Sequence, residues 1–249
     1  MTPRTIPALA LAALVAATLP GAAAGQSKAD AFAGKIPPVS GQLYRKGGRL
    51  ELTAFGDMSL NDAFFTKYFG GAKLAYHFTE SLSAAVYASA GAARSAGSAL
   101  VCSAAEGCAD PQDKELWQVP GRIRSIAGVE GAWTPVYGKL NVVAEQVAHF
   151  DLGVVIGPDA IMHDKVLAPA DADALELSGG TPSTETAIGG HIGLAARLFL
   201  AEWLALRLEV KDYIYLVEVP NNGGNDLQNQ LFTELGISVF IPPRNRPTR

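Results

Sequence analysis

The chain has 249 residues, of which 49% are hydrophobic and 18% are charged, and its formal net charge is −4. Such a balanced charge provides no basic field for a nucleic acid, and no aromatic-basic binding motif is present, so we expect no nucleic-acid partner. The length left after a removed leader fits one β domain with loops.

The first residues have the pattern of an export signal. Arg4 is followed by an apolar Ala/Leu/Val run to about Leu19, and residues 22–24 are three alanines that offer a small-residue cleavage site. The run is shorter than the roughly 20 apolar residues of a spanning helix. We therefore expect residues 1–24 to be a signal peptide that is removed, and residues 25–48 to be a periplasmic N-terminal tail.

Eight segments then alternate between apolar and polar residues with the period of a β-strand. The connections after the second, fourth and sixth segments are short, whereas those after the first, third, fifth and seventh are long and polar. We expect the longest to run from Pro158 to Thr186. Short turns at one end and long loops at the other are typical of an up-and-down outer-membrane barrel. The segments are 49–57, 70–78, 82–92, 122–133, 145–157, 187–199, 203–215 and 230–241.

The stretch WLALRLEVKDYIY, residues 203–215, shows the alternation most clearly. One face carries Leu204, Leu206, Leu208 and Val210, and the other carries Ala205, Arg207, Glu209 and Lys211. On pattern alone, a half-buried sheet of a soluble protein is the more common explanation. Residues 194–210 are also rich in good helix formers, which leaves a helix as a second alternative. The export signal and the rhythm of the loops favour an all-β fold, a single up-and-down antiparallel transmembrane β-barrel of about eight strands. We assign residues 49–242 to this barrel and residues 243–249 to a C-terminal tail.

In this barrel the aliphatic parity faces lipid and the charged parity faces inward. Uncharged rows such as Leu204, Leu206, Leu208 and Val210 suit the lipid face, because a charge on that face at mid-depth costs several kcal/mol. The interior of an eight-stranded barrel is just wide enough to be filled by side chains, so the inward charges should neutralise one another. We predict an interior charge network of Glu51, Lys73, His77, Arg124, Glu130, His149, Asp151, His191, Arg197, Arg207, Glu209, Lys211 and Glu234.

Aromatic residues gather near the ends of the predicted strands, where amphipathic rings would lie at the two membrane interfaces. The alternative is that these rings belong to a core or to turns. The predicted aromatic girdle comprises Phe78, Trp133, Tyr137, Trp203, Tyr213, Tyr215 and Phe240.

Cys102 and Cys108 are the only cysteines, and they enclose a short polar stretch. A metal site with histidine partners is the alternative, but none of the four histidines is near in sequence. An exported chain favours a disulfide that closes one loop.

Three stretches resemble the outer-membrane β-barrel domain family of myxobacteria and related bacteria, which includes barrel components of the gliding-motility machinery. They are SLNDAFFTKYFGGAKLAYHFTESL (59–82), WTPVYGKL with the following HFDL (133–152), and RLFLAEWLALRLEVKDYIY (197–215). The resemblance implies a small barrel in the outer membrane of a Gram-negative bacterium and, for some members, a role in an envelope-spanning motility complex.

No motif of a hydrolase, nucleotide-binding or metal-binding protein is present in the sequence. We therefore expect no enzyme and no cofactor, but a structural or interaction component of the envelope. Its partners would be outer-membrane lipid and other envelope proteins. A narrow passive channel for small solutes is the main alternative. A lipid-modifying barrel is another, because His149 and Asp151 share one face of a strand.

Overall fold

The computed structural model describes residues 44–97, 99–103, 107–143, 146–220 and 224–241. The predicted signal peptide, residues 25–43 of the predicted tail and the C-terminal tail lie outside them. No helix among the described residues has the length and apolarity that crossing a membrane would require. The elements are β1 Leu50–Ser59, β2 Phe65–His77, β3 Leu82–Ser95, β4 Val101–Ser103, β5 Gly107–Ala109, α2 Asp113–Leu116, β6 Ile123–Val143, β7 Gln146–Asp164, α3 Pro169–Leu177, β8 Thr184–Phe199, β9 Leu204–Val219 and β10 Gly224–Ile241.

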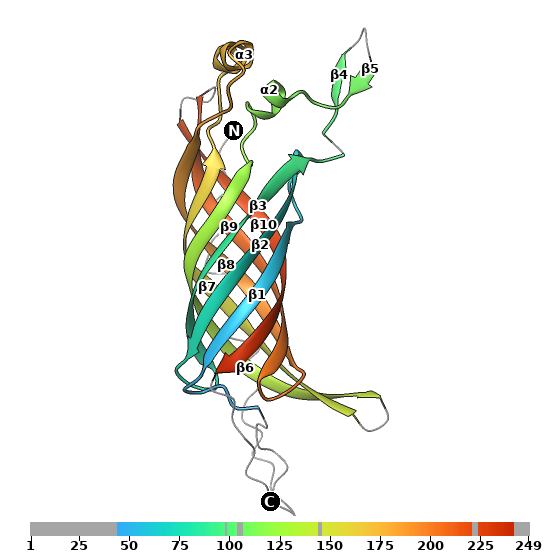
Figure 1. Cartoon of the computed structure of the whole chain (residues 1–249), viewed down its shortest axis with the longest axis vertical. Coiled ribbons are helices and arrows are strands. Elements are labelled where there is room, and N and C mark those ends of the chain that lie inside the picture. The colour runs from blue at the N-terminus through green and yellow to red at the C-terminus, as the bar shows by residue number, and fades with distance from the viewer. Residues whose placement is uncertain (1–43, 98, 104–106, 144–145, 221–223, 242–249) are drawn as a thin grey trace, which may run out of the picture. The chain divides into compact units, whose positions relative to one another are not determined.

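Eight long strands form a closed ring in which each strand pairs with its neighbours in the chain (Figure 1). All the pairings are antiparallel, and β1 closes the ring against β10 with Leu50 opposite Ile241. The short strands β4 and β5 pair with each other in a separate sheet. The structure confirms the predicted fold class, a single antiparallel up-and-down barrel of eight strands, and the helix alternative for residues 194–210 is wrong.

Every predicted segment coincides with a strand, but several strands are longer than predicted. β2 begins at Phe65 and β10 at Gly224, so the connections before them are short, contrary to the expected long loops. The Pro158–Thr186 connection also shrinks to residues 165–183, because β7 and β8 both extend into it. The connection 96–122 is therefore the longest. On the added parts of β2 and β7, polar side chains such as Lys67 and Asp159 are buried in the lumen, whereas residues 224–229 of β10 are exposed or half-buried. In the sequence pattern both kinds of polar residue resemble loop residues.

The outward face of the strands is aliphatic. Ile156, Leu194 and Leu235 have exposed fractions of 62%, 66% and 62%, and each belongs to an uncharged row on its strand. Soluble monomers rarely expose apolar patches this extensive. The outer surface of the barrel therefore has the character expected of a lipid-facing wall.

Two apolar clusters lie inside the barrel, one toward each end. The larger contains Ile123, Ile161, Val217 and Phe232 among others and lies at the end where the long connections emerge. The smaller contains Phe199, Ala205 and Phe240, with Tyr44 and Tyr137 packed against it, at the short-turn end. The buried charges of Glu130, Arg207 and Glu209 lie between these clusters, so the interior has three layers.

Candidate functional site

The centre of the lumen holds three cations and three carboxylates in mutual contact. The Lys73 ammonium lies 3.0 Å from Glu130, 2.7 Å from Glu209 and 3.3 Å from Glu234. The Lys211 ammonium lies 3.4, 2.8 and 2.5 Å from the same three carboxylates. Arg207 donates to Glu209 and, over 3.0 Å, to Glu130. We call these six residues the central charge cluster, and within it each charge faces several of opposite sign.

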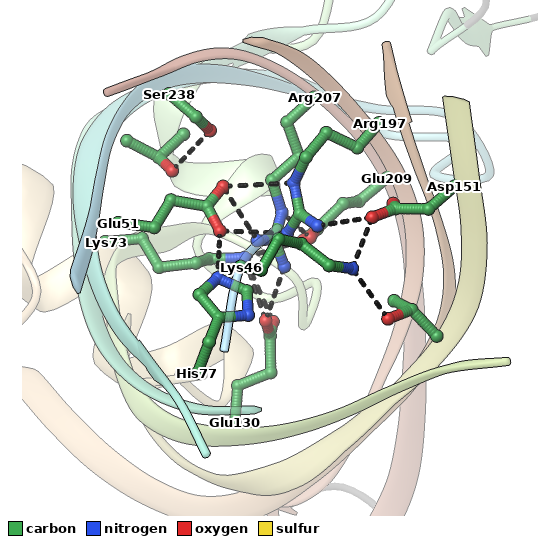
Figure 2. A network of polar contacts seen from close by, with 12 residues as sticks. Lys46, Glu51, Lys73, His77, Glu130, Asp151, Arg197, Arg207, Glu209 and Ser238 are labelled. Atoms are coloured by element: carbon green, nitrogen blue, oxygen red, sulfur yellow. Dashed lines mark hydrogen bonds and ion pairs between the residues drawn. The ribbon is translucent and has the colours of Figure 1, made fainter. Parts of the chain in front are cut away.

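A chain of ion pairs continues from this cluster toward the short-turn end (Figure 2). Glu51 lies 3.4 Å from Arg207 and 2.9 Å from Arg197, and it also binds His77 Nε2 at 2.7 Å. Arg197 reaches Asp151 at 2.8 Å. The chain therefore links residues from five strands, β1, β2, β7, β8 and β9, that are far apart in sequence.

Lys46, which precedes β1, ends this chain. Its ammonium binds the Asp151 carboxylate and donates to the Thr134 hydroxyl at 3.0 Å, and its backbone N–H donates to Glu80 at 2.7 Å. Burial and then repulsion from Arg197 lower the pKa of Lys46, and Asp151 opposes both effects. The last residues of the predicted tail are therefore part of the lumen, not a free segment.

Arg49 and Tyr44 close the same end of the barrel. The Arg49 guanidinium donates to the carbonyls of Glu202 and Phe240 at 2.9 and 3.2 Å and lies 5.0 Å from the centroid of the Phe240 ring. The Tyr44 ring stacks on Phe199 with a centroid distance of 5.2 Å. Residues 44–49 thus cover the short-turn mouth with two buried cations and an aromatic ring.

A second set of polar contacts lies toward the long-loop end. The Tyr87 hydroxyl donates to Asp159 at 2.6 Å, and His191 Nδ1 lies 2.8 Å from the same carboxylate. Farther along, Lys67 binds Asp62 and donates to Gln230 at 2.5 Å. Polar side chains therefore also find partners among the residues of the larger apolar cluster at this end.

The predicted interior residues are buried, with one exception. Arg124 was expected in the network, but half of its side chain is exposed, and it pairs with Asp164 at the mouth of the barrel. The β6–β7 register shifts between Ile123 and Ser125, and such a bulge reverses the inside-outside parity. Ile123 consequently takes the buried position and Arg124 the exposed one.

The predicted aromatic girdle is wrong for four of its members. Tyr213 and Tyr215 have the same parity as Arg207 and Glu209 and are buried in the lumen, and Phe240 has the parity of Glu234 and is buried as well. Tyr137 is half-buried, and its hydroxyl lies 2.8 Å from His149 Nδ1. Phe78, Trp133 and Trp203 do face outward, and Tyr76 and Tyr68 join them as exposed aromatic residues.

Sequence reasoning missed Lys46, Arg49, Asp159 and Lys67, all of which are buried. Parity could have found Lys67, because it shares the face of Lys73 on one strand, and Asp159, which shares the face of Asp151. Arg49 could have been found in the same way, because it opens the predicted segment 49–57 and shares the parity of Glu51. No periodic signal marks Lys46, because it precedes the predicted segment and reaches the lumen through tertiary folding.

The long connections 96–122 and 165–183 contact each other. The Leu167 backbone N–H donates to the Trp117 carbonyl at 2.9 Å, and Lys114 of α2 lies 3.2 Å from Glu176 of α3. The Glu176 carboxylate raises the pKa of Lys114. The predicted disulfide between Cys102 and Cys108 is present and joins β4 to β5. The described parts of these connections form a cap of two short helices and a cross-linked ribbon.

The described residues do not assemble a catalytic constellation around His149 and Asp151. His149 binds the Tyr137 hydroxyl, whereas Asp151 is occupied by Lys46 and Arg197. No group of three or more metal-ligating side chains is found in the described part of the chain. The chemistry that the site supports is charge neutralisation inside a closed wall.

No protein-family model matches this chain, and no curated protein matches it either. Among solved structures, the N-terminal β-barrel domain of Pseudomonas aeruginosa OprF is 9% identical, with a TM-score of 0.46, over 78% of this chain and 98% of that one. Neisserial surface protein A (NspA) is 10% identical, with a TM-score of 0.39, over 77% and 94% of the two chains. The assignment of the fold accordingly rests on the closed ring of strands itself.

Proposed function

We propose that this chain is a non-enzymatic β-barrel of the Gram-negative outer membrane that acts as a structural or interaction component of the envelope. The observation that carries the proposal is the solvent exclusion of the lumen. Glu209 and Glu51 are 0% exposed, and Arg207 is 2% exposed, although all three face the inside of the barrel.

A passive channel would require a continuous path of water along these residues. Charges that line such a path would be accessible to water, whereas here they contact one another and are closed in by apolar clusters at both ends. A filled lumen therefore favours a protein that binds partners through its outer surfaces over one that conducts solutes.

The membrane location is supported by the outward face. Its rows of Leu, Ile and Val carry no charge on the central parts of the strands, and a Gram-negative barrel of this size exposes such a band to lipid. The sequence pattern of residues 1–24, which is typical of an export signal, is consistent with this location.

The surface most suited to a partner is the cap formed by residues 96–122 and 165–183. Long ordered connections on a rigid scaffold often carry binding functions. The β4–β5 ribbon pairs only with itself and is exposed at Cys102 and Cys108. A part in a gliding-motility complex is the narrower form of this proposal, and only the sequence resemblance supports it.

The proposal is tested by reconstitution and by crosslinking. The purified barrel should insert into planar lipid bilayers without opening conductance steps, whereas a known porin in the same bilayers should conduct. In cells, deletion of residues 101–109 should remove crosslinks to envelope proteins and leave the heat-modifiable migration of the barrel unchanged. Regular conductance steps from the wild-type barrel would refute the filled lumen. Loss of function in an Arg207→Ala barrel that keeps its heat-modifiable migration, together with no effect of the cap deletion, would show that the lumen carries the function.

A further inference from the structure

The β6–β7 hairpin extends beyond the barrel at the short-turn end. β3 pairs with β6 only up to Trp133, and β8 pairs with β7 only from His149 onward, but β6 and β7 stay paired to Val143 and Gln146. Figure 1 shows this ribbon, in yellow-green, leaving the barrel and extending sideways, across the direction of the barrel axis.

A bulge explains why the ribbon turns away from the wall. The β6–β7 register shifts between Trp133 and Val136, where the sequence is Trp-Thr-Pro-Val. A bulge bends its strand, and Pro135 removes a backbone donor at the point where β6 parts from β3. The bend directs the outward face of the ribbon back along the barrel wall, because a strand that flares outward turns its outer side toward the wall's apolar belt.

The two faces of the ribbon differ in polarity. On the outward face lie Val136 and Leu140, which are 48% and 54% exposed, and the Phe150 ring lies directly over Gly138. On the opposite face Tyr137 turns toward the lumen, and Lys139 is exposed. The apolar face is continuous with the outward row of β7, which includes Leu152.

The level at which the ribbon begins is marked by aromatic residues. Trp133, Phe78, Tyr76 and Trp203 are all exposed at this end of the barrel. Such rings favour the boundary between hydrocarbon and head groups. A ribbon that starts next to Trp133 and runs sideways stays near that boundary, with its apolar face on the hydrocarbon side and Lys139 on the side of the aqueous phase.

We propose that the β6–β7 ribbon, described by residues 134–143 and 146–148, lies on the inner leaflet of the membrane as an interfacial anchor whose ligand is the lipid surface. This inference rests on the proposed membrane location of the barrel. Burial of Val136, Leu140 and Phe150 among acyl chains fixes the ribbon, and the face that carries Lys139 stays on the aqueous side. The ribbon holds the barrel at a defined depth and tilt.

The test uses single-cysteine variants, because both native cysteines are held in the disulfide. Leu140→Cys and Lys139→Cys, adjacent positions on opposite faces, each receive an environment-sensitive nitrobenzoxadiazole label. Leu194→Cys, on the outward face of β8, reports on the membrane location of the barrel. Each labelled protein is reconstituted in phosphatidylethanolamine–phosphatidylglycerol vesicles with and without spin-labelled lipid, and heat-modifiable migration verifies folding.

We expect blue-shifted emission and several-fold stronger quenching by spin-labelled lipid at position 140 than at position 139, with strong quenching at 194 as well. Quenching at 194 but equally water-like emission at 139 and 140 would overturn the anchor and leave the membrane location intact. Protection at 140 without quenching by lipid would mean that a second copy covers the ribbon, which also overturns the anchor. Absence of quenching at 194 would overturn the membrane location itself.

Discussion

Removal of one carboxylate from the central charge cluster should destabilise the barrel strongly. In Glu209→Gln, three cations lose a partner: Lys73 at 2.7 Å, Lys211 at 2.8 Å and Arg207. Removing one member of a buried pair costs about 3–5 kcal/mol. Each cation keeps two other carboxylates, so we expect a loss near the lower end, about 3 kcal/mol.

The second half of this prediction is a rescue. Lys73→Met alone should also destabilise, because it leaves three carboxylates facing two cations. In the double variant with Glu209→Gln the cluster is balanced again, and the combined loss should be smaller than the sum by about 2 kcal/mol. Glu185→Gln, which alters a solvent-exposed pair with Lys165, is the matched control and should leave stability nearly unchanged.

The assay is urea unfolding of each variant in phospholipid vesicles, followed by Trp fluorescence and by heat-modifiable gel migration. If the losses of the two single variants simply add in the double variant, the charges are independently solvated. The lumen would then contain water, and the argument against a channel would fail.

Three further changes test the wall and the cap. Leu208→Arg places a charge on the outward face and should cost about 2–4 kcal/mol in vesicles, whereas Leu177→Arg, on the exposed surface of α3, should have little effect in the same urea titration. Gly153→Ala would push a Cβ into a backbone carbonyl across the sheet and should cost about 1–3 kcal/mol. Gly131→Ala, whose nearest neighbour would be 3.7 Å away, should be tolerated, and equal midpoints for the two would contradict this packing. Cys102→Ser should free the β4–β5 ribbon for proteolysis without changing the unfolding midpoint of the barrel, since that ribbon forms a separate sheet.

Parity was the most informative property of the sequence. The alternation in residues 203–215 predicts the outward face of Leu208 and the inward face of Glu209, because side chains on a strand alternate strictly. The same rule, applied without exception, would have placed Tyr213 and Tyr215 in the lumen. Their aromatic rings suggested a position at the membrane interface instead, but the strict alternation of the strand directs both side chains into the lumen.

Two kinds of feature could not be predicted from periodicity. The bulge that turns Arg124 outward shifts the register at one point, and no residue pattern marks it unambiguously. Lys46 reaches Asp151 across 105 positions of sequence, so its burial depends on the closed barrel and not on a local pattern. Strand ends were also underestimated, because lumen-facing polar residues such as Lys67, which lies outside the predicted segment 70–78, resemble loop residues.

The ion-pair chain has a consequence for how the strands find their register. Sliding β1 by two residues against its neighbours would keep every aliphatic side chain outside and every polar one inside. Hydrophobic alternation alone therefore cannot separate the correct alignment from this error. The slip would, however, carry Glu51 about 7 Å along the barrel, away from Arg197 and Arg207, and strand buried charges without counterions. The ion pairs in the lumen thus favour the correct register of β1 over the shifted one, whereas the aliphatic exterior fits both registers equally well.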